Sequence, residues 1–246
     1  MARNQHARVF ARTTPEVLAD AMAILREDAS EYAFIGLAGG ASAGIAVVTL
    51  GVIGGPIAAA LIAPMLLLIA VYTLATSSAA VGAGASQLQP DASRAFAEAM
   101  GRGMALVRPW LPLVIVLGAA SGGIAAIPAH LGHSSRDAIV LVLAAGSGLF
   151  ALPRSLVATA LFEYDLSITD ALAASSAVVR MITRPVAMAW GVVLAPALLI
   201  LALGAIGGID VVIGAVAGVL FVGAMPAGAA LMSLLFRDAA TAAHQA

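Results

Sequence analysis

The stretch "AFIGLAGGASAGIAVVTLGVIGGPIAAALIAPMLLLIAVYTLATSSA" (33–79) contains no charged side chain from its first residue to its last. A membrane-spanning helix needs about 20 consecutive apolar residues. This run is long enough for two such helices, and "GVIGGP" (51–56) supplies the glycines and proline of a tight turn between them. The stretch therefore predicts a hairpin of two transmembrane helices.

The composition of the whole chain agrees with a membrane environment. Of its 246 residues, 62% are hydrophobic and only 10% are charged, against about 25% charged in soluble domains. The net charge of -1 offers no basic surface for nucleic acid, and the lack of cysteine excludes disulfides and thiolate metal sites. We therefore expect one membrane domain over residues 1–246.

Four more apolar runs follow the first hairpin. They lie at about 110–129, 138–162, 186–206 and 211–235. The sequence thus predicts an all-α integral membrane protein with six transmembrane helices arranged as three hairpins.

The arginines predict how these helices are oriented. Ten arginines lie before the first span, between spans two and three, between four and five, or after the sixth; the opposite turns hold only Arg136. Cytoplasmic loops are enriched in arginine and lysine, so both termini are expected in the cytoplasm. The exclusive use of arginine as the basic residue suggests a GC-rich bacterial genome, and hence the inner membrane of a bacterium.

Each predicted hairpin follows a more polar segment with helical periodicity, at 15–30, 91–107 and 168–182. These segments are too polar to cross a bilayer, and we expect amphipathic helices in the cytoplasmic interface. Trp110 and Trp190 lie near the predicted cytoplasmic ends of spans, where they are expected to form part of an aromatic belt.

The three units resemble one another in sequence. "MAILR" (22–26) matches "MALVR" (104–108), and the second helix of each hairpin carries a proline: Pro64, Pro153 and Pro226. We therefore predict three repeats, at about 13–80, 90–165 and 166–238.

Pairs of glycines four residues apart recur in the predicted spans. They are Gly40 and Gly44, Gly118 and Gly122, and Gly214 and Gly218. Such pairs allow two helix backbones to approach closely. The sequence leaves open whether the approaching helix belongs to the same chain or to a partner.

One arginine lies inside an apolar run, in "GLFALPRSLVATALFEYD" (148–165). Counted from the outer side, Arg154 lies about 24 Å into a core of about 30 Å, near the cytoplasmic boundary. Its guanidinium either extends to the headgroups near Glu163, Asp165 or Asp170, or lines a polar or lipid-headgroup site inside the bundle. Both alternatives stay open.

Motifs for chemistry are missing from the sequence. It contains no phosphate-binding loop, dinucleotide fingerprint, HExxH or GxSxG pattern. His130, His133 and Asp137 could together hold zinc, but a solvated outer turn explains them more simply. We expect no cofactor, no metal and no enzymatic activity.

The segment "ALFEYDLSITDALAASSAVVRMITRPVAMAWGVVL" (160–194) resembles the membrane domain attached to some bacterial glycerophosphodiester phosphodiesterases. The shared features are an acidic residue that ends one span, a short helix of the form "DAL..S..VVR", and a following span. The resemblance implies a fold and a membrane role. It transfers no activity, because the paired histidine and acidic ligands of the catalytic domain have no counterpart in this sequence.

These observations predict a non-enzymatic multi-pass membrane protein that acts as a scaffold or accessory subunit. Its expected partners are membrane lipids and either other membrane subunits or further copies of itself. The alternative is a transporter, channel or lipid-handling protein with a site near Arg154.

Overall fold

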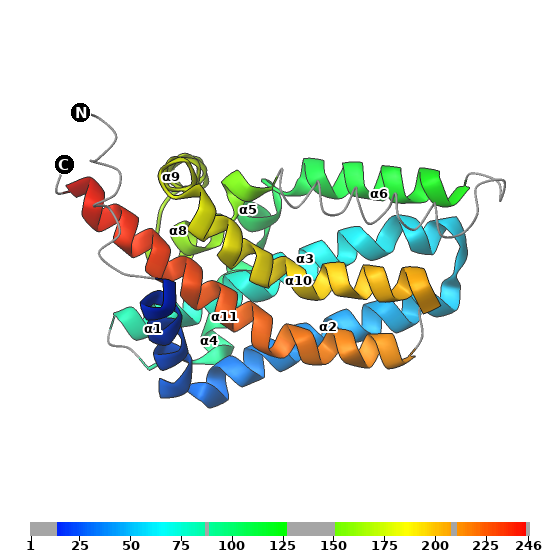
Figure 1. Ribbon diagram of the computed structural model, residues 1–246, viewed down its shortest axis with the longest axis horizontal. Helices are drawn as coiled ribbons and strands as arrows, with labels where there is room; N and C mark the ends of the chain where they lie inside the picture. Colours follow the sequence, from blue (N-terminus) through cyan, green and yellow to red (C-terminus); the bar gives the residue numbers. More distant parts are fainter. Residues whose placement is uncertain (1–13, 87–88, 127–150, 208–210, 245–246) are drawn as a thin grey trace.

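The computed structural model describes residues 14–86, 89–126, 151–207 and 211–244 (Figure 1). These residues form an all-α fold, without any strand. Long helices lie alongside one another along the length of the molecule, and we call them the long-helix bundle. They are α2 (Ala29–Ile53), α3 (Gly55–Ala85), α6 (Leu111–Ala126), α10 (Thr183–Gly207) and α11 (Val211–His244).

The turn predicted within 51–56 is present, at Gly54. This residue has a φ of 61°, a left-handed backbone conformation that glycine adopts without steric cost. Its N–H donates to the carbonyl of Leu50 at 2.9 Å, which ends α2, and α3 starts at the next residue. The chain therefore reverses within one residue, and α2 packs against α3.

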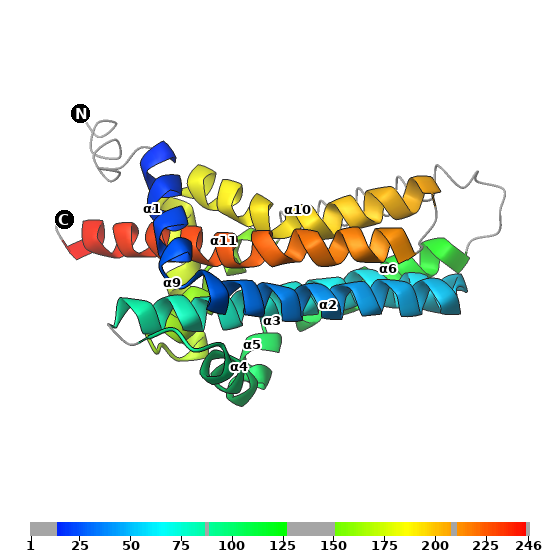
Figure 2. The same cartoon turned by 90° about the horizontal axis from the view of Figure 1, so that it is seen from below.

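Short helices gather at one end of the bundle, where the described part of α11 also ends (Figures 1 and 2). We call four of them the collar: α1 (Thr14–Glu27), α4 (Ala92–Gly101), α5 (Gly103–Val107) and α9 (Ile168–Met181). The prediction of helices at 15–30, 91–107 and 168–182 is confirmed, although the second is divided at Arg102.

Local hydrogen bonds explain where two collar helices begin. The carboxylate of Asp91 accepts from the N–H of Ser93 at 2.8 Å at the start of α4, and the hydroxyl of Ser167 accepts from the N–H of Asp170 at 3.3 Å at the start of α9. Such caps satisfy backbone donors that have no partner within the helix. The chain bends by 115° between α9 and the first part of α10, so that α9 runs across the bundle and appears end-on in Figure 1.

Among the described residues, three helices are long and apolar enough to cross a membrane: Ala29–Ile53, Ala60–Gly84 and Gly218–Ala242. The count rises to four if α9 and the first part of α10 together form one broken span, and Leu111–Gly123 is a shorter apolar helix. A helical protein with candidate membrane spans is thus observed. The prediction of six spans goes further than these residues show.

The fourth predicted span, 138–162, lies largely outside the described residues. Its described part is not one continuous helix. The chain forms a 3₁₀ turn, η3 (Leu152–Arg154), and becomes α-helical only in α8 (Val157–Glu163). Pro153 accounts for this break, because proline cannot donate to the helical ladder and its ring clashes with the preceding turn.

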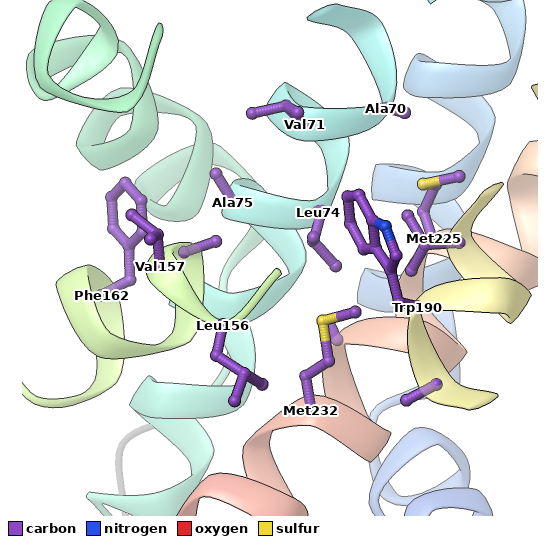
Figure 3. Close-up of a cluster of buried hydrophobic side chains, with 14 of the residues drawn as sticks. Ala70, Val71, Leu74, Ala75, Leu156, Val157, Phe162, Trp190, Met225 and Met232 are labelled. Carbon is purple, nitrogen blue, oxygen red and sulfur yellow. The ribbon is translucent and has the colours of Figure 1, made fainter. Parts of the chain in front are cut away.

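Buried apolar side chains fill the space between α3, α8, α10 and α11 (Figure 3). Leu74 of α3, Val157 of α8 and Met232 of α11 are each almost completely enclosed. Trp110 stacks on Trp190 with ring centroids 5.5 Å apart, and both rings are buried. The prediction that these tryptophans belong to a lipid-facing aromatic belt was therefore wrong: they join α10 to the segment before α6.

Candidate functional site

A buried carboxylate lies where α8 meets α3 and α11. The side chain of Glu163, the last residue of α8, is only 2% exposed. Its Oε2 accepts a hydrogen bond from the hydroxyl of Ser233 at 2.6 Å and another from the guanidinium of Arg237 at 3.1 Å. Its Oε1 is buried and has no hydrogen-bond partner in the structure. One oxygen of this carboxylate is thus held by α11, and the other is buried without a donor.

Burial raises the pKa of the Glu163 carboxyl above its ordinary value, and the contacts with Ser233 and Arg237 act in the opposite direction. Removal from water disfavours the charged form of an acid, whereas hydrogen bonds to that form favour it. The balance leaves an acid that binds its proton more tightly than an exposed glutamate does.

The chain directs Glu163 inward by ending α8 sharply. Asp165 has a φ of 51°, and the N–H of Leu166 donates to the carbonyl of Ala160 at 3.3 Å. This bond closes the end of α8, and the left-handed residue lies at the position directly after the C-cap, where many helices end. Aspartate adopts this conformation more readily than bulkier residues do.

Arg102 holds the same helix end from the collar. Its guanidinium donates to the carbonyl of Leu161 at 2.7 Å, forms an ion pair with Asp165, and lies over the ring of Phe162. A cation is favoured at a helix C-terminus, where backbone carbonyls lack partners. The junction of α4 and α5 is therefore fixed to α8.

The break at Pro153 is closed by a serine from α9. The hydroxyl of Ser175 donates to the carbonyl of Pro153 at 2.7 Å and accepts from the N–H of Leu156 at 3.2 Å. One side chain thus satisfies both a carbonyl and an N–H that the interrupted helix leaves unpaired. Arg154 lies in this turn with a half-buried side chain.

The three acidic residues expected around Arg154 each have different hydrogen-bond or ion-pair partners. Glu163 is bound by Ser233 and Arg237, Asp165 by Arg102, and Asp170 accepts from the hydroxyl of Ser167 at 2.6 Å. The candidate site of the described residues is therefore centred on Glu163.

A pocket of about 150 Å³ adjoins Glu163, between α3, α4 and α8. Small residues of α3, among them Ala80 and Gly82, form one wall. The charged side chains of Asp91, Arg94 and Glu98 line it from the α4 side. The pocket therefore combines an apolar wall with carboxylates and one guanidinium.

The predicted packing glycines occupy different environments. A Cβ added to Gly40 would lie 2.3 Å from the carbonyl oxygen of Gly218, so α2 and α11 touch through their backbones there. At Gly118 it would lie 3.2 Å from the carbonyl oxygen of Ala60. Gly44 and Gly122 are half-buried on α2 and α6, and Gly214 belongs to α11.

The other predicted polar cluster, His130, His133 and Asp137, lies outside the described residues. Within the described ranges, no group of three or more histidine, aspartate or glutamate side chains is placed to hold a metal ion.

Sequence reasoning missed the partners of Glu163. Ser233 and Arg237 are four residues apart, a spacing that places two side chains on one face of a helix. This polar pair inside an apolar helix was a signal that α11 faces a polar group. Ser175 and Arg102 gave no comparable signal, because their contacts join segments that are distant in sequence.

In fold, the described residues form an all-α bundle with candidate membrane spans and a polar collar at one end. In comparisons with known proteins, no family model, curated protein or solved structure matches the chain.

Proposed function

We propose that this chain is a non-enzymatic multi-pass membrane protein that acts as a scaffold or accessory subunit, presenting its collar to a membrane-associated partner. The proposal includes six spans in three repeated units, both termini in the cytoplasm, and placement in a bacterial inner membrane. The collar then lies at the cytoplasmic surface, as the arginine distribution predicts.

The attachment of the collar through polar side chains is the observation that carries this proposal. Polar side chains join it to the rest of the fold at separate places. Glu31 of α2 accepts from the N–H of Ala92 at 2.9 Å, Arg102 binds the end of α8, and Ser175 closes the break at Pro153. Partly or fully buried polar groups thus hold short helices in place, which suits a surface that presents contacts.

The collar also exposes apolar side chains. Met100 is 70% exposed and Met104 is 85% exposed, four residues apart across the α4–α5 junction. Met22 of α1 and Met181 of α9 are exposed as well. Methionine is flexible and polarizable, and it is frequent on surfaces that bind other proteins. These side chains therefore offer contacts to a partner subunit or to the lipid interface.

Photo-crosslinking can distinguish contact with a partner subunit from contact with lipid. A photoreactive amino acid at position 104 should give a protein adduct of one defined mass in native membranes. The same residue at position 52, on an exposed part of the candidate span α2, should give lipid adducts. Lipid adducts alone at both positions, together with a protein that runs only as a lone monomer in mild detergent, would contradict the scaffold proposal.

The proposed orientation of the chain in the membrane can be tested separately. Tags at either terminus should be accessible only from the cytoplasm, and a tag within 130–137 only from the outside. An N-terminal tag accessible from outside would contradict the proposed orientation.

A second candidate function is a transporter, channel or lipid-handling protein. The break at Pro153–Arg154 favours it, because interrupted helices form binding sites in many transporters. Two nearby hydroxyls, of Ser155 and Thr159, are buried without hydrogen-bond partners. If this function is correct, Arg154→Leu should abolish activity or growth while the protein still folds. Retained function in that variant would contradict it.

A further inference from the structure

We propose that the pocket between α3, α4 and α8 binds a primary ammonium group, with the free oxygen of Glu163 as its principal acceptor. The group could be carried by a small soluble amine or by the ethanolamine headgroup of a phospholipid. This inference goes beyond the scaffold function and does not depend on it.

The first argument is that one oxygen of the Glu163 carboxylate has no hydrogen-bond donor. Ser233 and Arg237 both bind Oε2 of Glu163, which leaves Oε1 buried without a donor. A buried acceptor without a partner is unfavourable, and a site that retains one is suited to a ligand that supplies the donor. Glu163 lines the pocket, so an N–H group bound there is adjacent to this carboxylate.

The second argument is the size and shape of the pocket. Its volume of about 150 Å³ is comparable to that of an engineered protein cavity that binds benzene, a ligand of six heavy atoms. A Cβ added at Gly82 would lie 3.1 Å from Cγ of Glu163, so glycine leaves room for the glutamate beside α3. Ala80 and Gly82 are buried, whereas Asp91 and Arg94 are exposed and mark the side that opens to the surface.

The third argument is charge. Asp91, Glu98 and Glu163 line the pocket together with Arg94, and Arg237 pairs with Glu163 through Oε2, so three carboxylates face two guanidiniums and the formal charge stays negative. The carboxylate of Asp91 already accepts backbone N–H groups of α4. Oε1 of Glu163 and the carboxylate of Glu98 therefore remain to receive a cation. Arg94, near the surface, is placed to face an anion attached to that cation, as in a phosphoethanolamine group.

The same features select among cations. A trimethylammonium group has no N–H to donate to Oε1, and proteins recognise it with aromatic cages; here Phe162 is the aromatic residue that lines the pocket. A metal ion fits less well, because no metal-binding group of acidic or histidine side chains occurs among the described residues. A primary ammonium carries both the charge and the donors that the pocket needs.

The test uses the full chain in nanodiscs of phosphatidylcholine. Ethanolamine, phosphoethanolamine and choline are titrated by calorimetry, and the thermal midpoint is compared with that in nanodiscs that also contain phosphatidylethanolamine. Binding of soluble ethanolamine would identify a free amine as the ligand. Stabilisation by phosphatidylethanolamine without binding of ethanolamine would identify the headgroup.

Variants connect the binding to the pocket. Glu163→Gln should weaken the affinity about tenfold or more, because a charged hydrogen bond is lost. Ala83→Leu should weaken it similarly by filling the pocket, while it leaves every charge in place; this variant keeps the test valid if Glu163→Gln does not fold. Glu27→Gln, which removes an exposed acid of α1, should bind as the unaltered protein does.

Three results would overturn the proposal. They are no response to either ethanolamine or phosphatidylethanolamine, equal binding of choline, and binding that survives both Glu163→Gln and Ala83→Leu.

Discussion

The long-helix bundle and the collar are held together in different ways. Where α2 meets α11, the contact is made by backbone atoms, and an added Cβ at Gly36 or Gly40 would lie 2.3 Å from a carbonyl oxygen of the other helix. Where the collar meets the rest of the fold, apolar side chains such as Leu106 and Val178 are buried, and hydrogen bonds from Glu31, Arg102 and Ser175 and the ion pair of Arg102 with Asp165 are added to this packing.

If the chain lies in a membrane as we propose, the difference follows from the solvent of each region. Within a bilayer, apolar side chains gain little by leaving lipid for another helix, so close packing through small residues decides which helices associate. At the polar end, water and headgroups compete for every polar group, and a hydrogen bond that is shielded from them fixes a position. Close packing therefore specifies the bundle, and at the collar polar contacts are added to apolar packing.

The largest expected effect on stability comes from adding a side-chain atom where α2 and α11 touch through their backbones. Gly40→Ala places a methyl group against the carbonyl oxygen of Gly218 and should lower the free energy of unfolding by about 3 kcal/mol, as overpacking does. The measurement is denaturant unfolding in mixed micelles.

Gly223→Ala is the matched control for this prediction. Gly223 lies in α11, and an added Cβ there meets no atom within 4 Å. It should be neutral or stabilising by up to about 1 kcal/mol, since alanine favours the helix. Equal losses in the two variants would show that the glycines matter for flexibility and not for the close contact.

The next effect tests the collar at the Pro153 break. Ser175→Ala removes the partner of both the Pro153 carbonyl and the Leu156 N–H. We expect a loss of about 2 kcal/mol, because buried backbone groups are left without partners. Ser176→Ala, one residue further along α9, should cost much less. Hydrogen exchange should show the largest change in the N–H of Leu156, and unchanged exchange there would contradict this account.

Local patterns in the sequence predicted much of the fold. The turn at Gly54 and the helices of the collar follow from glycine, proline, capping residues and helical periodicity, which act over a few residues. The pairing of Gly40 with Gly218 was not predictable from either glycine alone, because the same spacing suits many partner helices.

The candidate site was predicted only in part. Glu163, Asp165 and Asp170 were identified as candidates, but their partners come from Ser233, Arg237 and Arg102, which are remote in sequence. The position of a long side chain depends on which helices meet, and an apolar pattern shows that a face is buried without showing against what. Trp110 and Trp190 illustrate this, because a residue type common at lipid interfaces proved to be buried here.

A smaller effect is expected at the α4–α5 junction. Arg102→Gln removes the ion pair with Asp165 and weakens the bond to the Leu161 carbonyl. Since Asp165 is 84% exposed, the ion pair contributes little, and we expect a total loss of about 1 kcal/mol from the bond to the carbonyl. Asp165→Asn should cost about 0.5 kcal/mol or less. A larger loss in Asp165→Asn than in Arg102→Gln would mean that the ion pair, and not the helix end, holds the collar.

The smallest effect is a change with pH at Glu163, whose pKa burial raises above its ordinary value. The folded protein therefore keeps this proton to a higher pH than the unfolded chain does. Its contribution to stability is complete below the ordinary pKa and is lost as the pH rises through the raised pKa. The unaltered protein should thus lose stability relative to Glu163→Gln, which has no titrating group there, as the pH rises above the ordinary pKa of glutamate and through the raised one.

The measurement is the difference in thermal midpoint between the two proteins across this pH range. If the thermal midpoint of the unaltered protein instead rises relative to that of Glu163→Gln as the pH increases, the expected direction is reversed. That result would mean that Ser233 and Arg237 stabilise the carboxylate by more than burial disfavours it. The site would then belong with the polar contacts of the collar. The expected sign instead places Glu163 with the buried groups of the bundle, where an acid is retained although its charge is unfavourable.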